Sequence, residues 1–277
     1  MSYLNTRNSY ADVDGKRIAY RELSVGRTAL PLVMLVHLAA NMDNWDPKLV
    51  DALARNRHLI LLDLPGVGAS EGSVELSLEE SAGHAIDILR ALGHDRFDLL
   101  GLSMGGMIAQ EIVRACPQSV RKLILVGTAP RGGIGVDRVT SVTFGHMLHA
   151  AIRRKDMKRY IFFTNDETGE AAASATFARL DSREPRHQDA PVTVPDFLAQ
   201  LKAIKRWGKE AEDDLSFVRI PTLIANGNDD AMVPTPNSHT MHEKIDGSKL
   251  VLYPHAGHGS LFQYAHEFAH EVDTFLR

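Results

Sequence analysis

The sequence lacks three features that would each indicate a particular class of protein. It has one cysteine, Cys116, among 277 residues, so it can form neither an internal disulfide nor a thiolate cluster for a metal ion. No stretch reaches the roughly 18 apolar residues of a membrane helix, and the first residues lack the apolar run of a signal peptide. Such a chain suits a reducing compartment, so we expect a soluble cytoplasmic protein with no membrane partner.

A strong charge of either sign is also missing. The chain has 31 basic and 35 acidic residues, which gives a net charge of −4. We therefore expect no basic field of the kind that holds nucleic acid. Apolar residues make up 44% and charged residues 24%, a composition typical of globular proteins and unlike that of disordered or coiled-coil chains. The length fits one large α/β domain or a core with an inserted subdomain.

Short segments that are apolar throughout and closed by Gly or Pro predict strands covered on both faces. Two further segments, 9–13 and 17–21, flank Asp14 and Gly15, a dipeptide typical of hairpin turns. The apolar segments are residues 32–36, 58–62, 97–100, 122–126, 221–225 and 250–253.

Helical periodicity lies between the later strands, over residues 78–92, 104–115 and 261–276. The alternation of strands and helices predicts the α/β class: a mostly parallel sheet with helices on both faces and an antiparallel hairpin at one edge. Residues 131–215 break the alternation, because they contain four helical patterns and no convincing strand (139–152, 157–163, 170–180 and 195–207). We expect a core of residues 1–131 and 216–277 with an inserted helical cap at 132–215.

A candidate nucleophile lies between a predicted strand and a predicted helix. Residues 101–105 read Gly-Leu-Ser-Met-Gly, and this pattern places the Ser103 hydroxyl on a sharp turn above the sheet. Taken alone, the pattern also fits a glycine-rich turn with an unreactive serine. A serine needs a base, and the base needs an orienting acid. Two strand ends supply candidates: Asp229 or Asp230 after residues 222–225, and His255 or His258 after residues 250–253.

The sequence resembles the α/β-hydrolase superfamily over nearly its whole length. It is most similar to the capped branch of small bacterial esterases, enol-lactonases and cofactor-free haloperoxidases. The resemblance rests on Gly-Leu-Ser-Met-Gly-Gly at 101–106, Asp-Leu-Pro-Gly-Val-Gly-Ala-Ser at 63–70, Gly-Asn-Asp-Asp-Ala-Met-Val-Pro at 227–234, and Gly-His at 257–258. It implies the α/β-hydrolase fold with Ser103, Asp230 and His258 as the catalytic residues.

The resemblance also implies an oxyanion hole made of main-chain N–H groups. One donor is the N–H of Met104, and the other is the N–H of Leu38, where relatives usually have glycine after the residue that matches His37. His37 is expected to hold this loop, and Trp45 to pack the loop against the core. The Leu38 side chain is expected to narrow the acyl side of the pocket.

The activity expected from this resemblance is carboxylic ester hydrolysis through an acyl-enzyme, with no cofactor. Lactone or enol-lactone hydrolysis and perhydrolysis by a cofactor-free haloperoxidase use the same residues and stay as alternatives. A ligand-binding receptor on the same fold is a further alternative. No His or Cys cluster has the sequence spacing of a metal site. The expected partner is a small-molecule ester or lactone, and a homodimer is kept as a possible assembly.

The predicted cap offers candidates for the substrate pocket. Trp207, Phe144 and Phe163 are the aromatic residues that we expect to line it, Trp207 foremost. The basic residues Arg153, Arg154, Lys155, Lys158 and Arg159 are expected to form a solvated face. Uncharged, moderately apolar esters are therefore the predicted substrates.

Overall fold

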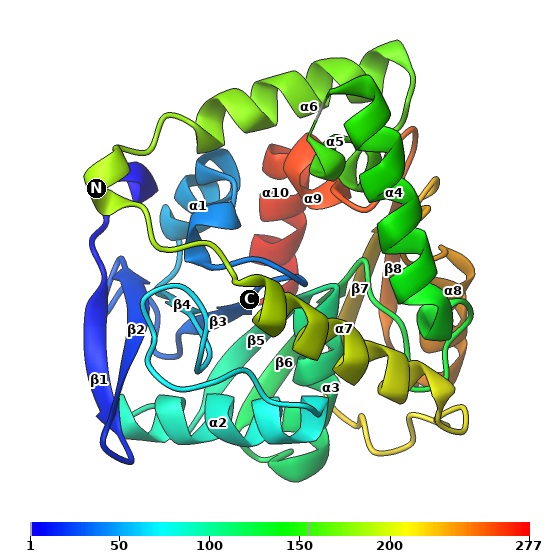
Figure 1. Cartoon of the computed structure of the whole chain (residues 1–277). Helices are drawn as coiled ribbons and strands as arrows, with labels where there is room; N and C mark the ends of the chain where they lie inside the picture. The colour runs from blue at the N-terminus through cyan, green and yellow to red at the C-terminus, as the bar shows by residue number, and fades with distance from the viewer. Residues whose placement is uncertain (1, 155) are drawn as a thin grey trace.

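The computed structural model describes residues 2–154 and 156–277, and an eight-stranded sheet runs through it (Figure 1). The strand order is β1-β2-β4-β3-β5-β6-β7-β8. β1, β2 and β4 pair antiparallel, and every pair from β4–β3 through to β7–β8 is parallel. The strands are β1 Ser9–Val13, β2 Lys16–Leu23, β3 Leu32–Leu35, β4 Leu59–Leu62, β5 Phe97–Leu102, β6 Val120–Val126, β7 Thr222–Gly227 and β8 Lys249–Tyr253.

This architecture confirms the predicted fold class. The central strands β3, β4, β5 and β7 are buried at every position, as expected for parallel strands that helices cover on both faces. Asp14 and Gly15 have positive φ angles of 53° and 74°, which is the backbone that the β1–β2 turn requires.

Helices α1 and α10 pack against each other, as do α2 and α3, and the two pairs lie on opposite faces of the sheet (Figure 1). These helices are amphipathic, and their apolar sides join the buried core of the sheet. Among residues 2–154 and 156–277, no helix combines the length and apolarity that crossing a bilayer requires. The helices of the core are α1 Pro47–Ala54, α2 Leu78–Ala91, α3 Met104–Ala115, α8 Pro236–Lys244, α9 Ser260–Gln263 and α10 Ala265–Phe275.

The final helix differs from the prediction of one continuous helix over residues 261–276. It is divided at Tyr264, whose backbone has φ −104° and ψ 40°. The Tyr264 ring stacks on Tyr253 with 5.0 Å between centroids, and its hydroxyl donates a hydrogen bond to the Pro254 carbonyl. These tertiary contacts to the end of β8 hold Tyr264 out of the helical conformation.

Among the described residues, four α-helices separate β6 from β7, and we call them the inserted helices. They are α4 Val139–Arg153, α5 Met157–Phe162, α6 Glu167–Leu180 and α7 Val194–Lys209. Their positions agree with the four helical patterns seen in the sequence, and no strand occurs among the described residues of 131–215. They contact both sides of the core, because α6 packs on α1 and α9 while α7 packs on α2 (Figure 1).

Candidate active site

The turn that carries Ser103 joins β5 directly to α3. Ser103 has φ 57° and ψ −117°, a strained conformation for a residue with a side chain. The turn is tight because a Cβ added at Gly101 would lie 2.3 Å from the carbonyl oxygen of Gly105. The main chain of Ser103 is fixed on both sides: its N–H donates to the Val126 carbonyl (2.8 Å), and its carbonyl accepts from the Thr128 hydroxyl (2.8 Å).

An aspartate–histidine pair lies on the loops after β7 and β8. Asp230 Oδ2 is 2.7 Å from His258 Nδ1, and both side chains are buried. The other oxygen, Oδ1, accepts hydrogen bonds from the N–H groups of Met232 (2.8 Å) and Val233 (2.9 Å). With Nδ1 held by the carboxylate, Nε2 of His258 is the nitrogen left to act on a substrate or nucleophile.

The rival candidates lie in different surroundings. Asp229 is exposed, and its main-chain N–H donates to the Ala256 carbonyl. His255 is also exposed, and its positive φ of 49° marks it as a turn residue. The structure thus brings together Ser103, Asp230 and His258 and leaves Asp229 and His255 at the surface.

Ser103 and His258 line one cavity of about 410 Å³ between the sheet edge and the inserted helices. Its wall is mainly apolar and includes one cationic side chain, Lys158. The lining residues are His37, Leu38, Ala39, Ser103, Thr143, Met157, Lys158, Ile161, Phe162, Phe197, Met232 and His258.

The loop after β3 contributes Leu38 to this cavity. Within the described residues, no hydrogen bond uses the N–H of Leu38 or that of Met104, the first residue of α3. Both donors are therefore available for an oxyanion, as the resemblance implies. Ala39 has a positive φ of 57°, and its N–H donates to the side chain of Gln200 on α7 (2.8 Å).

Gln200 was not identified from the sequence. It lies 4% exposed on the apolar side of α7, together with Leu201, Ile204 and Trp207. An amide among apolar positions of an amphipathic helix is the signal that could have indicated a buried hydrogen bond.

His37 is buried beside the same loop, and its Nδ1–H donates to the Leu38 carbonyl (2.8 Å). Its pKa is lowered to about 3, first because burial disfavours the charged ring and then because Lys158 is close. The ring packs on Phe162 of α5 (centroids 4.7 Å apart), and Phe162 in turn packs on His258 (5.3 Å). The Phe162 carbonyl also accepts from the Gly259 N–H (2.7 Å), so α5 contacts both loops of the site.

The three aromatic residues expected in the pocket do not line this cavity. Trp207 is 2% exposed, and its indole N–H donates to Glu111 of α3 (3.3 Å). Its side chain therefore links α7 to the core. Phe144 is 46% exposed on the outer side of α4. Phe163 lines a smaller neighbouring cavity of about 270 Å³ and packs on Phe177. Trp45, by contrast, is buried in the core next to Phe262, as expected.

The basic segment also differs from the expected solvated face. Arg153 and Arg154 are exposed, Arg159 pairs with Glu170, and Lys155 lies outside the described residues. Lys158, however, is only partly exposed and lines the cavity with Ser103. Burial lowers the pKa of its ammonium group. No ion pair within the described residues involves this group.

Thr143 on α4 is a second polar group of the cavity wall that the sequence did not indicate. The residue is 1% exposed, and its hydroxyl has no hydrogen-bond partner among the described residues. An unpaired buried hydroxyl costs free energy unless something else binds it. A substrate that enters the cavity can supply that partner.

The structure has a second apolar cavity, of about 600 Å³. Its lining includes Met104, Gln200, Glu75 and His84 but neither Ser103 nor His258. We therefore assign the candidate reacting centre to the smaller cavity, which contains both.

Comparison with known proteins agrees with this fold. The family model described as alpha/beta hydrolase fold matches residues 31–264. A pimeloyl-[acyl-carrier protein] methyl ester esterase of Nitrosomonas europaea is 28% identical over 88% of this chain and 94% of its own. A 2-hydroxy-6-oxononadienedioate/2-hydroxy-6-oxononatrienedioate hydrolase of Klebsiella pneumoniae is 31% identical over 84% of this chain and 80% of its own.

Among solved structures, an alpha/beta hydrolase fold protein from Chitinophaga pinensis superposes with a TM-score of 0.93 at 31% identity. That match covers 100% of this chain and 99% of the other. Sequence and structure together show that this chain belongs to the alpha/beta hydrolase fold family.

Proposed function

We propose that the protein is a serine hydrolase that cleaves carboxylic esters. The observation that carries this proposal is that strained Ser103, His258 of the buried His258–Asp230 pair and Leu38 line one cavity, while the N–H groups of Leu38 and Met104 donate to no partner among the described residues. The methyl ester esterase among its relatives also supports ester chemistry. The inserted helices at 132–215 act as the cap that covers the reacting centre.

In the proposed reaction, Ser103 Oγ attacks the ester carbonyl while His258 Nε2 takes the hydroxyl proton. Asp230 holds the imidazole in the required tautomer and stabilises the imidazolium. The N–H groups of Leu38 and Met104 stabilise the oxyanion of the tetrahedral intermediate. His258 then gives the proton to the leaving alcohol, and a water molecule activated by His258 releases the acid.

We infer that the preferred substrate has an apolar body and one acidic or strongly polar group. Apolar side chains such as Ile161, Phe197 and Met232 line most of the cavity, while Lys158 and Thr143 supply a cation and an unpaired hydroxyl. A substrate carboxylate would partner both groups. This inference replaces the expectation of uncharged esters, which assumed that Lys158 faces solvent.

Hydrolysis of a carbon–carbon bond next to the keto group of a keto acid is the second candidate, and Lys158 and Thr143 of the cavity wall support it. The Klebsiella relative is named for a dioate, a molecule with two carboxylates and a keto group. Lactones and peroxide-dependent peracid formation use the same three residues and stay as outcomes of a substrate screen.

The decisive experiment compares wild type with Ser103→Ala on aryl and alkyl esters. We expect kcat to fall by about 10⁴-fold or more while the melting temperature changes little, because the hydroxyl supplies the covalent step. A fluorophosphonate probe should label the wild type at Ser103 and leave the variant unlabelled. Near-normal turnover by Ser103→Ala would refute the mechanism, and a folded wild type that the probe does not label would favour the receptor alternative.

A further inference from the structure

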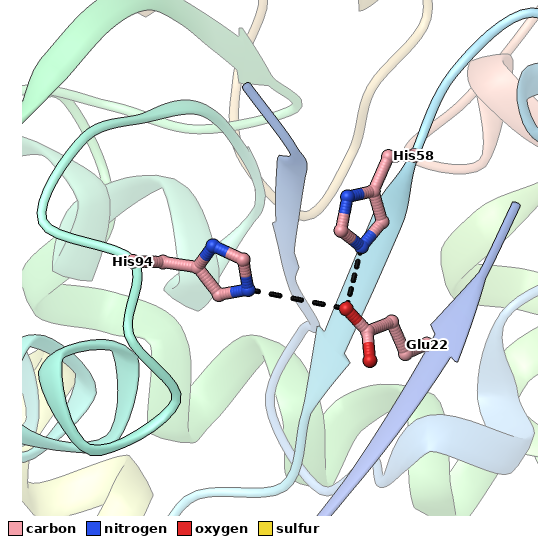
Figure 2. Close-up of side chains that lie close together, drawn as sticks. All are labelled: Glu22, His58 and His94. Carbon is pink, nitrogen blue, oxygen red and sulfur yellow. Dashed lines mark hydrogen bonds and ion pairs between the residues drawn. The ribbon is translucent and has the colours of Figure 1, made fainter. Parts of the chain in front are cut away.

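A cluster of two histidines and one glutamate lies at the sheet edge opposite the candidate active site. Glu22 is near the end of β2, His58 immediately precedes β4, and His94 lies between α2 and β5 (Figure 2). Since Ser103, Asp230 and His258 follow the carboxyl ends of parallel strands, groups at the amino ends of β4 and β5 belong to a separate site. Nothing in the proposed reaction uses them.

The three side chains converge on a small volume (Figure 2). His58 Nε2 is 2.6 Å and His94 Nε2 is 3.9 Å from the same oxygen, Glu22 Oε1. One ligand atom from each residue lies within 4.8 Å of the other two. The two imidazole rings meet edge to face, with 5.7 Å between their centroids.

Secondary structure fixes the main chain of each residue. His94 follows Gly93, which has a φ of 81° and ends α2 in a Schellman motif, with His94 N–H donating to the Leu89 carbonyl (2.9 Å). The carbonyl of His58 accepts from the Leu32 N–H (2.8 Å). Glu22 is registered opposite Ile60 in the β2–β4 ladder. The ligand atoms can therefore adjust only by side-chain rotation.

We propose that Glu22, His58 and His94 form a binding site for a divalent transition-metal ion of the zinc type. Two imidazoles and one carboxylate are borderline ligands that suit such an ion. An ion about 2.0–2.2 Å from each ligand in a tetrahedral site needs ligand atoms roughly 3.3 Å apart, and the observed 2.6 and 3.9 Å fall on either side of this separation.

Burial supports the same conclusion. The His58 side chain is 6% exposed, whereas those of His94 and Glu22 are 22% and 26% exposed. One side of the cluster is closed and the other is open, so a water molecule can complete four-coordination.

The ion would join β2 to the connection that precedes β5, which predicts an effect on stability and none on catalysis. The test uses untagged full-length protein stripped with EDTA. Titration with ZnCl₂ by calorimetry should give one ion per chain and a higher melting temperature, and CoCl₂ should give the visible absorption bands of a four-coordinate ion.

Variants assign the site. His94→Ala and, separately, Glu22→Gln should weaken zinc binding at least about tenfold, because each removes one of three protein ligands. His266→Ala, at an exposed histidine on α10, is the matched control and should bind like wild type. Ester hydrolysis by His94→Ala should equal that of wild type.

Absence of binding at millimolar zinc would overturn the proposal and leave the cluster as a hydrogen-bonded network. Binding that survives both ligand variants would overturn it as well. Because the readouts are affinity and melting temperature, these results are independent of whether the protein hydrolyses esters.

Discussion

The two walls of the cavity hold their polar groups in opposite ways. On the sheet edge, Asp230 accepts three hydrogen bonds and the Ser103 main chain is bonded on both sides. On the inserted helices, the Thr143 hydroxyl has no partner and Lys158 has no ion pair among the described residues. In the proposed reaction this difference would let the sheet edge act as a preorganised reacting centre and the helices bind the substrate.

Contacts of Gln200 and Phe162 connect these walls. Gln200 of α7 binds the main chain of Ala39, and Phe162 of α5 packs between His37 and His258. The inserted helices therefore support the reacting groups as well as facing them. Substitutions that affect one wall only can separate chemistry from recognition.

The largest effect is expected on the sheet edge, from Asp230→Asn. A carboxamide cannot hold His258 in the required tautomer, so kcat should fall roughly 10⁴-fold. Asp229→Asn is the matched control, and because Asp229 is exposed its kcat should stay within a few-fold of wild type. The opposite ranking of the two folded variants would show that the acid is misassigned.

The different construction of the two walls also explains what the sequence could predict. All eight strands and the turn that carries Ser103 follow from local patterns, because a sharp turn or a strand end requires particular residues at fixed spacing. The same patterns left two acids and two histidines open, and the family resemblance singled out Asp230 and His258. The positions of the inserted helices were predictable from the helical periodicity of their apolar residues. Which side of each helix faces Ser103 depends on tertiary packing. The cavity with Ser103 is therefore lined by Lys158, which was expected to face solvent, and by Thr143, which was not identified, and by none of the three expected aromatic residues.

The cluster of Glu22, His58 and His94 could not be predicted from the sequence for a related reason. Glu22, His58 and His94 are 36 residues apart at each step along the chain, and no local motif relates them. They meet only because the sheet order places β2 beside β4 and the α2–β5 connection near both.

The second prediction concerns His37, a residue of the loop after β3. Its pKa is lowered by burial and by the nearby Lys158 of α5. Its pKa is about 3 in the folded protein, against about 6.5 in an unfolded chain, so the unfolded state binds the proton first as pH falls. Folding stability should therefore be lost below about pH 6.5. When the pH falls from 7 to 5, protonation of this one group should lower the free energy of unfolding by about 2 kcal/mol.

Urea unfolding of wild type and His37→Asn at the two pH values measures this contribution. Asparagine can still donate to the Leu38 carbonyl but does not titrate, so its loss of stability on acidification should be smaller by that amount. Equal losses in the two proteins would show that His37 is not held neutral by burial.

The third prediction changes only the helix wall, through Lys158→Met. A charge-assisted hydrogen bond contributes about 1.5–3 kcal/mol, so kcat/KM for a monoester of a dicarboxylic acid should fall about tenfold or more, mainly through KM. The matched neutral dimethyl ester should react as in wild type, and Lys158→Arg should retain part of the preference. If both esters lost activity equally, Lys158 would support the fold and not the substrate.

The smallest effect is expected from Trp207→Phe, which separates packing from pocket lining. Trp207 joins α7 to α3 through its hydrogen bond to Glu111 and lies away from the Ser103 cavity. Losing that bond and part of the ring should cost about 1 kcal/mol of folding stability, measured by urea unfolding, while Glu111 keeps its ion pair with Arg131. The dependence of kcat/KM on acyl length should not change. If the acyl-length dependence shifted while stability stayed unchanged, Trp207 would contact the substrate. In that case α7 would line the substrate pocket through Trp207 as well as through Phe197.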